Sequence, residues 1–309
     1  MSGAALREPE ALERINALAI PPAWVDVWIC PDERGHIQAA GTDAAGRRQY
    51  IYHRSWREQR EAAKHARTLA LATSLPRARR ETSAALRGRD LSYERVMATA
   101  FRVLDVASIR IGSESYAAEH ETYGLATLQR RDVKVTNSLV QFQFVGKGGI
   151  PQEFSFRNAA LARAIGDLVE RDDANSELLG WQHSDGWHDV RSTDINSYIK
   201  DVTRGDFTAK DFRTWNATVL MAQVLAIAGP VEAERARKRT IANAYAVVAE
   251  YLGNTPAIAR SSYVDSRIVD LYSDGVVLPG RVLPKSHRRL PIHGRVERAV
   301  LSMLGNAPH

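Results

Sequence analysis

Four residues of the 309-residue chain stand in short, distinctive contexts and carry side chains that could do chemistry. Arginine and lysine are cationic donors suited to anionic groups, and tyrosine carries a hydroxyl that can act as a nucleophile. The chemistry open to such a set is therefore work on an anionic substrate. The contexts are Ser108-Ile109-Arg110-Ile111-Gly112, Lys147 on the glycine turn 146–149, Arg213 in Lys210-Asp211-Phe212-Arg213-Thr214, and Tyr263, nine residues after Asn254.

Each of these residues has an ordinary structural explanation when it is taken alone. Arg110 would be an ion-pair partner, Lys147 a solvated turn residue and Arg213 a charge on a helix surface. Tyr263 would be a core residue with a hydrated hydroxyl. For any single residue the structural explanation is favoured, so a functional interpretation needs the set as a whole.

Several other kinds of site are excluded by missing motifs. The turn 146–149 lacks the Gly-Lys-Ser/Thr of a phosphate loop and does not precede a helix, which argues against a nucleoside triphosphate site. The sequence has no metalloprotease helix motif, no EF-hand loop and no serine elbow. His183 and His188 flank a tryptophan-containing turn, and we interpret them as packing residues. We expect no cofactor and no metal.

The charge balance is basic, with 42 Lys and Arg against 36 Asp and Glu and a pI near 9.5. A basic surface favours a polyanionic partner, although each basic cluster taken alone is explained as a solvated face. The clusters are Arg77, Arg79, Arg80, Arg87 and Arg89; Arg235, Arg237, Lys238 and Arg239; and Lys285, His287, Arg288 and Arg289.

The single cysteine, Cys30, excludes an internal disulfide and fits a reducing compartment. The segment from Met1 to Ile20 carries charges throughout and lacks the apolar core of a signal peptide. No stretch approaches the roughly 20 apolar residues of a membrane span. We therefore expect a cytoplasmic protein without membrane contact.

The residue pattern predicts a small β-rich segment followed by a larger, mainly helical one. In the first segment it predicts a helix over 9–18 and strands over 25–30, 36–40 and 49–53. A helical pattern follows over 58–72. The stretch Ser74 to Asp90 contains Pro76, Gly88 and many arginines, and is typical of a loop or a frayed connection.

The second segment is expected to hold one three-stranded sheet among helices. Ser92 is the predicted N-cap of a helix over 93–107, and Pro230 suits the start of the last long helix. The predicted strands are 132–135, 139–145 and 152–156, and the later helices are 158–170, 193–202, 208–228 and 231–251. The fold class predicted is α+β.

Together the motifs resemble one family, the poxvirus-like and bacterial type IB DNA topoisomerases. The resemblance runs from about Ile20 to Ile268 and keeps the order and separations of the family's motifs. It rests on Arg110-Ile111-Gly112 with 119–128 (Glu-His-Glu-Thr-Tyr-Gly-Leu-Ala-Thr-Leu), Phe144-Val145-Gly146-Lys147-Gly148, Asp211-Phe212-Arg213-Thr214-Trp215, Leu252-Gly253-Asn254-Thr255-Pro256 with Tyr263, and Gly46-Arg47-Arg48-Gln49-Tyr50-Ile51-Tyr52.

The resemblance implies a fold and a partner. It implies an N-terminal antiparallel sheet domain, residues 1–62, and a mainly helical catalytic domain, residues 63–309, which clamp double-stranded DNA as a monomer. A DNA partner also implies that the cytoplasmic protein is nucleoid-associated. The hinge implied lies near Arg57 to Lys64, earlier than the loop that composition suggests. DNA contacts implied in the N-terminal domain are Arg47, Arg48, Gln49, Tyr50 and Tyr52.

The resemblance also implies a mechanism without ATP or metal. Tyr263 would attack the scissile phosphate and form a 3′-phosphotyrosine, and Arg110 and Arg213 would grip the nonbridging oxygens. Lys147 would protonate the leaving 5′-oxygen, and Asn254 would add a neutral donor. Many relatives have histidine at the position of Asn254, so this residue is where the chain departs from its family.

Two other functions remain alternatives at this stage. Tyrosine recombinases use similar arginine, lysine and tyrosine chemistry, but usually carry His-x-x-Arg where this chain has Lys210-x-x-Arg213. They also have a helical N-terminal domain, whereas this one is predicted to be β-rich. The other alternative is a DNA-binding protein without catalysis.

Overall fold

The computed structural model describes residues 7–114, 117, 119, 121–284, 290 and 292–306. The chain divides into two compact units, Met1–Ala66 and Arg67–His309. The break between them lies inside one long helix, α2 (Arg54–Ala85), and the predicted boundary after residue 62 falls in the same helix.

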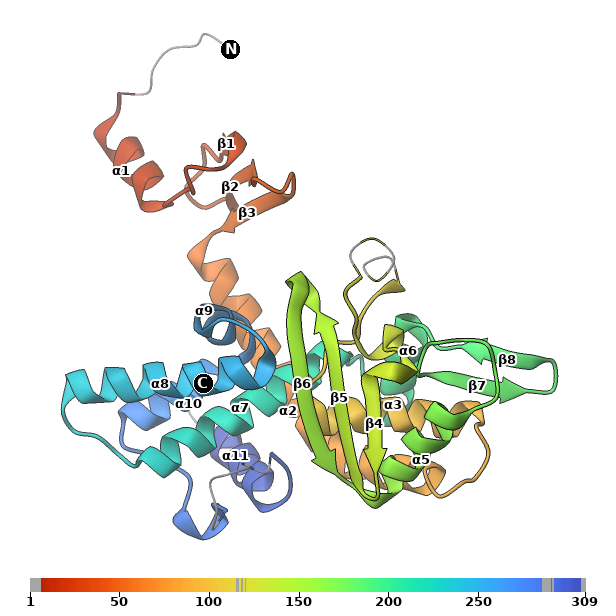
Figure 1. Cartoon of the computed structure of the whole chain (residues 1–309). Helices are drawn as coiled ribbons and strands as arrows, with labels where there is room; N and C mark the ends of the chain where they lie inside the picture. Colours follow the sequence, from red (N-terminus) through yellow and green to blue (C-terminus); the bar gives the residue numbers. More distant parts are fainter. Residues whose placement is uncertain are drawn as a thin grey trace. The chain divides into compact units, whose positions relative to one another are not determined.

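In its described residues the smaller unit holds the helix α1, a three-stranded antiparallel sheet, as predicted, and the first part of α2 (Figure 1). Arg14 from the helix donates to Gln38 Oε1 at 2.8 Å and to the carbonyl oxygen of Cys30 at 2.7 Å, which fixes the helix to the sheet. The elements are α1 (Pro9–Ala17), β1 (Val25–Ile29), β2 (Ile37–Thr42) and β3 (Arg48–Tyr52).

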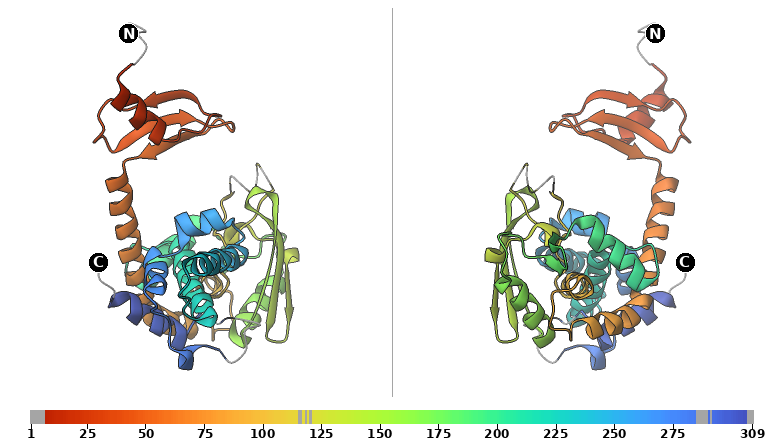
Figure 2. Two further views of the ribbon diagram at one scale, coloured as in Figure 1. Left: turned by 90° about the vertical axis from the view of Figure 1, so that its left-hand side faces the viewer. Right: turned by 90° about the vertical axis from the view of Figure 1, so that its right-hand side faces the viewer.

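The larger unit is mainly helical, with one three-stranded antiparallel sheet alongside its helices (Figures 1 and 2). The predicted α+β class is confirmed.

The described helices of the larger unit, after the end of α2, are α3 (Tyr93–Ala107), α5 (Ala159–Glu170), α6 (Ser192–Thr203), α7 (Ala209–Ala228), α8 (Glu234–Leu252), α9 (Pro256–Ile258), α10 (Ser266–Ser273) and α11 (Arg295–Gly305). Its strands are β4 (Val133–Thr136), β5 (Leu139–Gly146), β6 (Ile150–Arg157), β7 (Gly180–His183) and β8 (Gly186–Asp189). Short turns of helix are η1 (Leu125–Thr127), η2 (Arg130–Asp132), η3 (Lys147–Gly149), η4 (Ala259–Tyr263) and η5 (Gly280–Val282).

Helix α7 lies at the centre of the larger unit and is buried on nearly every face. Trp215 is fully buried, and Phe212 packs edge-on against Phe101 of α3 at 5.2 Å between ring centroids. Burial of side chains of this size supplies about 1.5–3 kcal/mol each. Because α7 is held from all sides, a side chain projecting from it has a well-fixed position.

The predicted loop from Ser74 to Asp90 is wrong over most of its length, because α2 continues to Ala85. Leu71, Leu75 and Ala78 are fully buried and lie on one face at helical spacing. Pro76 is exposed within the helix, although proline normally breaks helices because it lacks an N–H donor. Tertiary packing of the buried face outweighs that local preference.

The arginines of this segment were interpreted as a solvated face, which is wrong for Arg79. Its guanidinium bonds Asp105 of α3 at 2.7 Å and Glu297 of α11 at 2.6 Å. His293 also contacts Asp105, which is fully buried. Burial would raise the pKa of Asp105, but His293 and Arg79 hold it well below its ordinary value. This buried network ties the C-terminal helix to α2 and α3.

Two further expectations differ from the structure, and one hairpin was missed. Helix α8 begins at Glu234, so Pro230 lies in the preceding loop and not at the helix start. Ser92 takes the N-cap position of α3, but its side chain does not cap the helix. The β7–β8 hairpin was not predicted.

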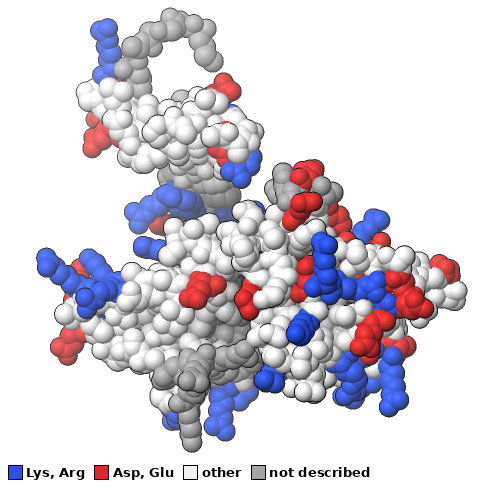
Figure 3. Space-filling model, in the orientation of Figure 1, with Lys and Arg blue, Asp and Glu red and all other residues white. Residues whose placement is uncertain are grey.

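The basic clusters behave differently from one another. Arg235, Lys238 and Arg239 are exposed at the start of α8, as a solvated face would be (Figure 3). The cluster Lys285, His287, Arg288 and Arg289 lies outside the described residues. Among the helices that are described, none is both long and apolar enough to cross a membrane.

Candidate active site

Arg110 lies in an extended segment that follows the end of α3. Its carbonyl oxygen accepts from Leu125 N at 2.9 Å, so the segment pairs with the chain around Gly124. A Cβ on Gly124 would lie 2.4 Å from Gly112 N, so both glycines of the two motifs are needed for this close approach. The motif residue His120 lies outside the described residues.

The guanidinium groups of Arg110 and Arg213 donate hydrogen bonds to carbonyl oxygens at the C-terminal end of α8. Arg213 Nη2 donates to the carbonyl oxygen of Leu252 at 2.9 Å, and Arg110 Nη2 donates to that of Gly253 at 3.2 Å. The last carbonyls of a helix lack partners within the helix and carry partial negative charge, so cations are favoured there. Gly253 ends the helix in the left-handed region, with φ +58°.

Arg213 projects from the first turns of α7 and is 4% exposed. Its Nη1 donates to the carbonyl oxygen of Ser108, so one side chain joins the ends of α3 and α8. Burial, with a smaller effect of the nearby Arg110 charge, lowers the pKa of Arg213. Its Nε is buried and has no hydrogen-bond partner among the described residues.

Asn254 follows Gly253 and orients its amide toward Arg110. Its Oδ1 accepts from Arg110 Nη2. Its Nδ2 is buried without a hydrogen-bond partner in the described part of the chain. The two arginines donate to carbonyl and amide oxygens, Arg213 also interacts with the Tyr263 hydroxyl, and none of their contacts in the described residues is with a carboxylate.

Tyr263 ends the π-helical turn η4, and its position is fixed by α7. Thr218 of α7 is fully buried, and its Oγ1 accepts from Asp265 N at 3.1 Å and lies 3.5 Å from Tyr263 O. The half-buried Tyr263 ring lies 5.0 Å from the guanidinium carbon of Arg213.

The electrostatic setting of Tyr263 favours its ionised form. Burial raises the pKa of the phenol, but the charge of Arg213, followed by those of Arg110 and Lys210, outweighs burial and lowers the pKa below its ordinary value.

Tyr251 is a second tyrosine near Arg213 that the sequence motifs did not single out. Its hydroxyl lies 2.9 Å from Ser108 Oγ, and burial raises its pKa to about 12. The sequence signal for it is only its place on the apolar face of α8, beside Val248 and Leu252. Of the two tyrosines, only Tyr263 has a setting that favours loss of the proton.

Lys147 lies at the tip of the β5–β6 hairpin and is exposed. Gly148 and Gly149 have φ of +77° and +74°, which allows the tight turn that presents it. A cavity of about 900 Å³ is lined by Arg110, Lys147 and Arg213. Tyr263 and Asn254 do not line it, but each contacts one of the lining arginines.

The five predicted residues of the larger unit therefore lie around one site. They come from the hairpin, from the segment after α3, from α7, and from the two sides of α9 (Figure 1). The arrangement presents unpaired N–H donors and two guanidinium groups beside a tyrosine of lowered pKa. Such a set can stabilise negative charge on an oxyanion and supply an oxygen nucleophile.

The residues predicted in the smaller unit form a different arrangement. Arg47 and Gln49 both bond Asp43 Oδ2, at 3.0 and 2.9 Å, and Arg48 donates to the carbonyl oxygen of Asp26. The hydrogen bond from Arg47 is the main cause that lowers the pKa of Asp43 to about 2.

The two tyrosines of β3 differ in exposure. Tyr50 is 46% exposed, whereas Tyr52 stacks on Trp56 at 4.1 Å between ring centroids. Of the two, Tyr50 is the one that offers its ring to solvent.

Comparisons with known proteins point to one family. Residues 53–273 match the family model of the eukaryotic DNA topoisomerase I catalytic core, and residues 1–43 match that of the bacterial DNA topoisomerase IB N-terminal domain. Both matches follow the order of the two units.

Individual relatives agree with the family models. DNA topoisomerase 1B of Acanthamoeba polyphaga mimivirus is 30% identical over 281 residues, covering 85% of this chain and 80% of the relative. DNA topoisomerase 1B of vaccinia virus (strain Copenhagen) is 22% identical over 236 residues, covering 76% of this chain and 72% of the relative. The chain belongs to the type IB DNA topoisomerase family.

Proposed function

We propose that this chain relaxes supercoiled duplex DNA by cutting one strand through Tyr263 and resealing it, without ATP and without a metal ion. The observation that carries the proposal is the pairing of Tyr263 with Arg213. The phenol has a lowered pKa, and the neighbouring arginine is buried with an unpaired Nε and no carboxylate among its described contacts.

The cleavage step is a transesterification at phosphorus. The Tyr263 oxygen attacks the scissile phosphorus, the bond to the 5′-oxygen breaks, and a 3′-phosphotyrosine and a free 5′-hydroxyl result. Arg110 and Arg213 bind the nonbridging oxygens, where negative charge gathers in the transition state. The unpaired Nδ2 of Asn254 is a further donor for the same oxygens.

Two protons must move in this step. The phenol proton of Tyr263 passes to water, which the cationic surroundings favour because they stabilise the phenolate. Lys147, which lines the same cavity as the two arginines, donates a proton to the leaving 5′-oxygen. Resealing is the reverse of these steps, and the phosphotyrosine bond conserves the energy of the phosphodiester, so no ATP is consumed.

We also propose that one copy of the chain is sufficient. All five proposed catalytic residues belong to the unit Arg67–His309 of a single chain, so no second copy has to complete the site. In the smaller unit, we propose that Tyr50 and the arginines beside it contact the duplex. The support for this is the exposure of Tyr50 and of Arg48 on β3.

The decisive experiment is plasmid relaxation in EDTA without ATP. The wild-type protein should relax supercoiled plasmid that carries no paired target sites, which a recombinase requires. A covalent adduct trapped on a nicked suicide duplex should map to Tyr263, with a 5′-hydroxyl on the released strand. Failure to form any adduct, with duplex binding intact, would favour a DNA-binding protein without catalysis.

A further inference from the structure

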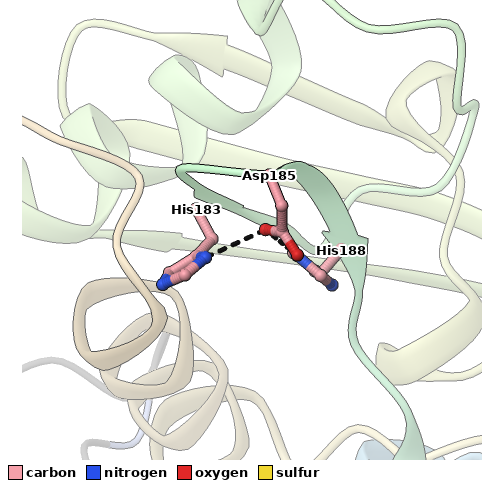
Figure 4. Close-up of side chains that lie close together, drawn as sticks. All are labelled: His183, Asp185 and His188. Atoms are coloured by element: carbon pink, nitrogen blue, oxygen red, sulfur yellow. Dashed lines mark hydrogen bonds and ion pairs between the residues drawn. The ribbon is translucent and has the colours of Figure 1, made fainter.

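The β7–β8 hairpin brings two histidines and an aspartate together at its turn (Figure 4). In this antiparallel pair, Trp181 lies opposite His188 and His183 opposite Gly186. Residues two apart on a strand share a face, so His183 and Trp181 lie on the face that also carries His188. Asp185 occupies the turn between the strands. The hairpin thus gathers residues whose spacing alone did not suggest a site.

Packing accounts only in part for these histidines. Their side chains are 59% and 39% exposed, and that of Asp185 is 66% exposed. On this face of the hairpin, the Trp181 ring packs edge-on against Tyr93, with 5.4 Å between the ring centroids. The sequence-based interpretation as packing residues holds for the His188 ring, which stacks on Trp181, but not for the exposed His183.

The three side chains point their donor atoms at one another. His183 Nδ1 lies 2.9 Å and His188 Nε2 lies 2.8 Å from the same oxygen, Asp185 Oδ1. One donor atom from each residue lies within 4.8 Å of the others. Donor atoms around a tetrahedral ion with bonds of about 2.0–2.1 Å lie roughly 3.4 Å apart. Small side-chain rotations therefore convert this cluster into three ligands of one ion.

The surroundings favour a cation and fix the ligands. The ion-pair partners of Asp185 in the described residues are the two histidines, with no lysine or arginine. The His188 ring stacks on Trp181 at 4.4 Å and 17° between planes, which holds its orientation. None of these residues lines the cavity of Arg110 and Arg213, so the cluster is separate from the proposed active site.

We propose that His183, Asp185 and His188 form a surface site for a divalent transition ion such as Zn²⁺, Ni²⁺ or Cu²⁺. Two imidazoles and one carboxylate suit these ions, whereas Mg²⁺ and Ca²⁺ prefer sets made only of oxygen. The exposed side leaves a fourth position for water or for a ligand from a partner. An ion held there cross-links the two strands of the hairpin and has no part in strand cleavage.

The test is calorimetric titration of the full-length, EDTA-treated and dialysed protein with ZnCl₂ and NiCl₂. We expect saturable binding of one ion per chain, and no binding of Mg²⁺ at the same concentrations. His183→Ala and His188→Ala should each weaken binding at least tenfold. The matched control His36→Ala, a histidine of the other unit, should leave it unchanged. Unchanged binding in both hairpin variants would overturn the proposal, as would absence of binding in the wild type.

A second readout locates the ion directly. Cu²⁺ at His188 should quench the fluorescence of Trp181, which stacks on that ring. Trp181→Phe should reduce this quenching while calorimetry still shows one bound ion. The double variant His183→Ala/His188→Ala should keep its circular dichroism spectrum and relax plasmid in EDTA within twofold of wild type. Loss of metal binding is thereby distinguished from failure of the proposed function.

Discussion

Arginines occur beside tyrosines in both units, but the hydrogen-bond partners of these arginines differ between the units. In the larger unit Arg213 is 4% exposed, and its hydrogen bonds go to backbone carbonyls. In the smaller unit Arg47 is an exposed residue paired with the carboxylate of Asp43. A carbonyl positions a guanidinium without neutralising it, whereas a carboxylate largely satisfies its charge.

This difference indicates which of the two settings binds a phosphate more strongly. A buried cation without a counter-ion is costly to maintain, so an incoming anion relieves the cost and binds strongly. An exposed, paired arginine offers an anion little more than solvent does. The same residue types therefore predict catalysis in one unit and, at most, auxiliary DNA contact in the other.

The largest effect is expected at Tyr263, whose ring contacts Arg213. Tyr263→Phe removes the nucleophile and should abolish both plasmid relaxation and covalent adducts, with duplex affinity nearly unchanged. Tyr251→Phe is the matched control, because it removes only a hydrogen bond worth about 1 kcal/mol and should slow cleavage by less than about tenfold. Adduct formation by Tyr263→Phe would exclude this residue as the nucleophile.

Next in size is removal of the guanidinium groups themselves. Arg213→Ala or Arg110→Ala should reduce single-turnover cleavage by about 100- to 1,000-fold, because each loses a preorganised donor to the transition state. Arg47→Ala in the smaller unit should change the same rate by less than about threefold. Equal losses at Arg47 and Arg213 would contradict the distinction between the two settings.

A smaller loss is expected at Asn254. It supplies an uncharged amide, and its Nδ2 is the donor left without a partner in the described residues. Asn254→Ala should slow single-turnover cleavage less than Arg110→Ala or Arg213→Ala does, because a neutral donor stabilises negative charge less than a cation. An equal or larger loss at Asn254 would contradict this ranking.

The pH dependence of cleavage reports the charges around Tyr263. A lowered pKa means that the phenolate forms at a lower pH than for an ordinary tyrosine, so the rise of rate with pH should level off below pH 10. Lys210→Met removes one of the charges that lower this pKa, so the inflection should move to higher pH. Rates of single-turnover cleavage between pH 6 and 10 test this, and a shift to lower pH would refute it.

The smallest effect is expected at Asp43. Asp43→Asn removes a negative charge and releases Arg47 and Gln49, so duplex binding should tighten by about two- to threefold at low salt. The salt dependence of binding should also steepen, because more counterions are displaced. Weaker binding of the variant would show that Asp43 orders these side chains for DNA contact.

The sequence by itself predicted the α+β class, the elements with strong periodicity and the five residues of the proposed active site. The alternation of Val140, Phe142 and Phe144 predicts β5 because a strand buries every second side chain. The motif residues could be chosen because their types and order are those of a known family. These are local properties, and a sequence displays them directly.

Only the tertiary structure decided which side chains are paired and which are not. Helix α2 continues through Pro76 because Leu71, Leu75 and Ala78 find a core to bury them, which no local preference reveals. His183 and His188 meet because a hairpin folds them onto one face. The setting that lowers the pKa of Tyr263 depends on Arg213, 50 residues earlier in the chain. Burial and charge act through space, so they are set only when the chain has folded.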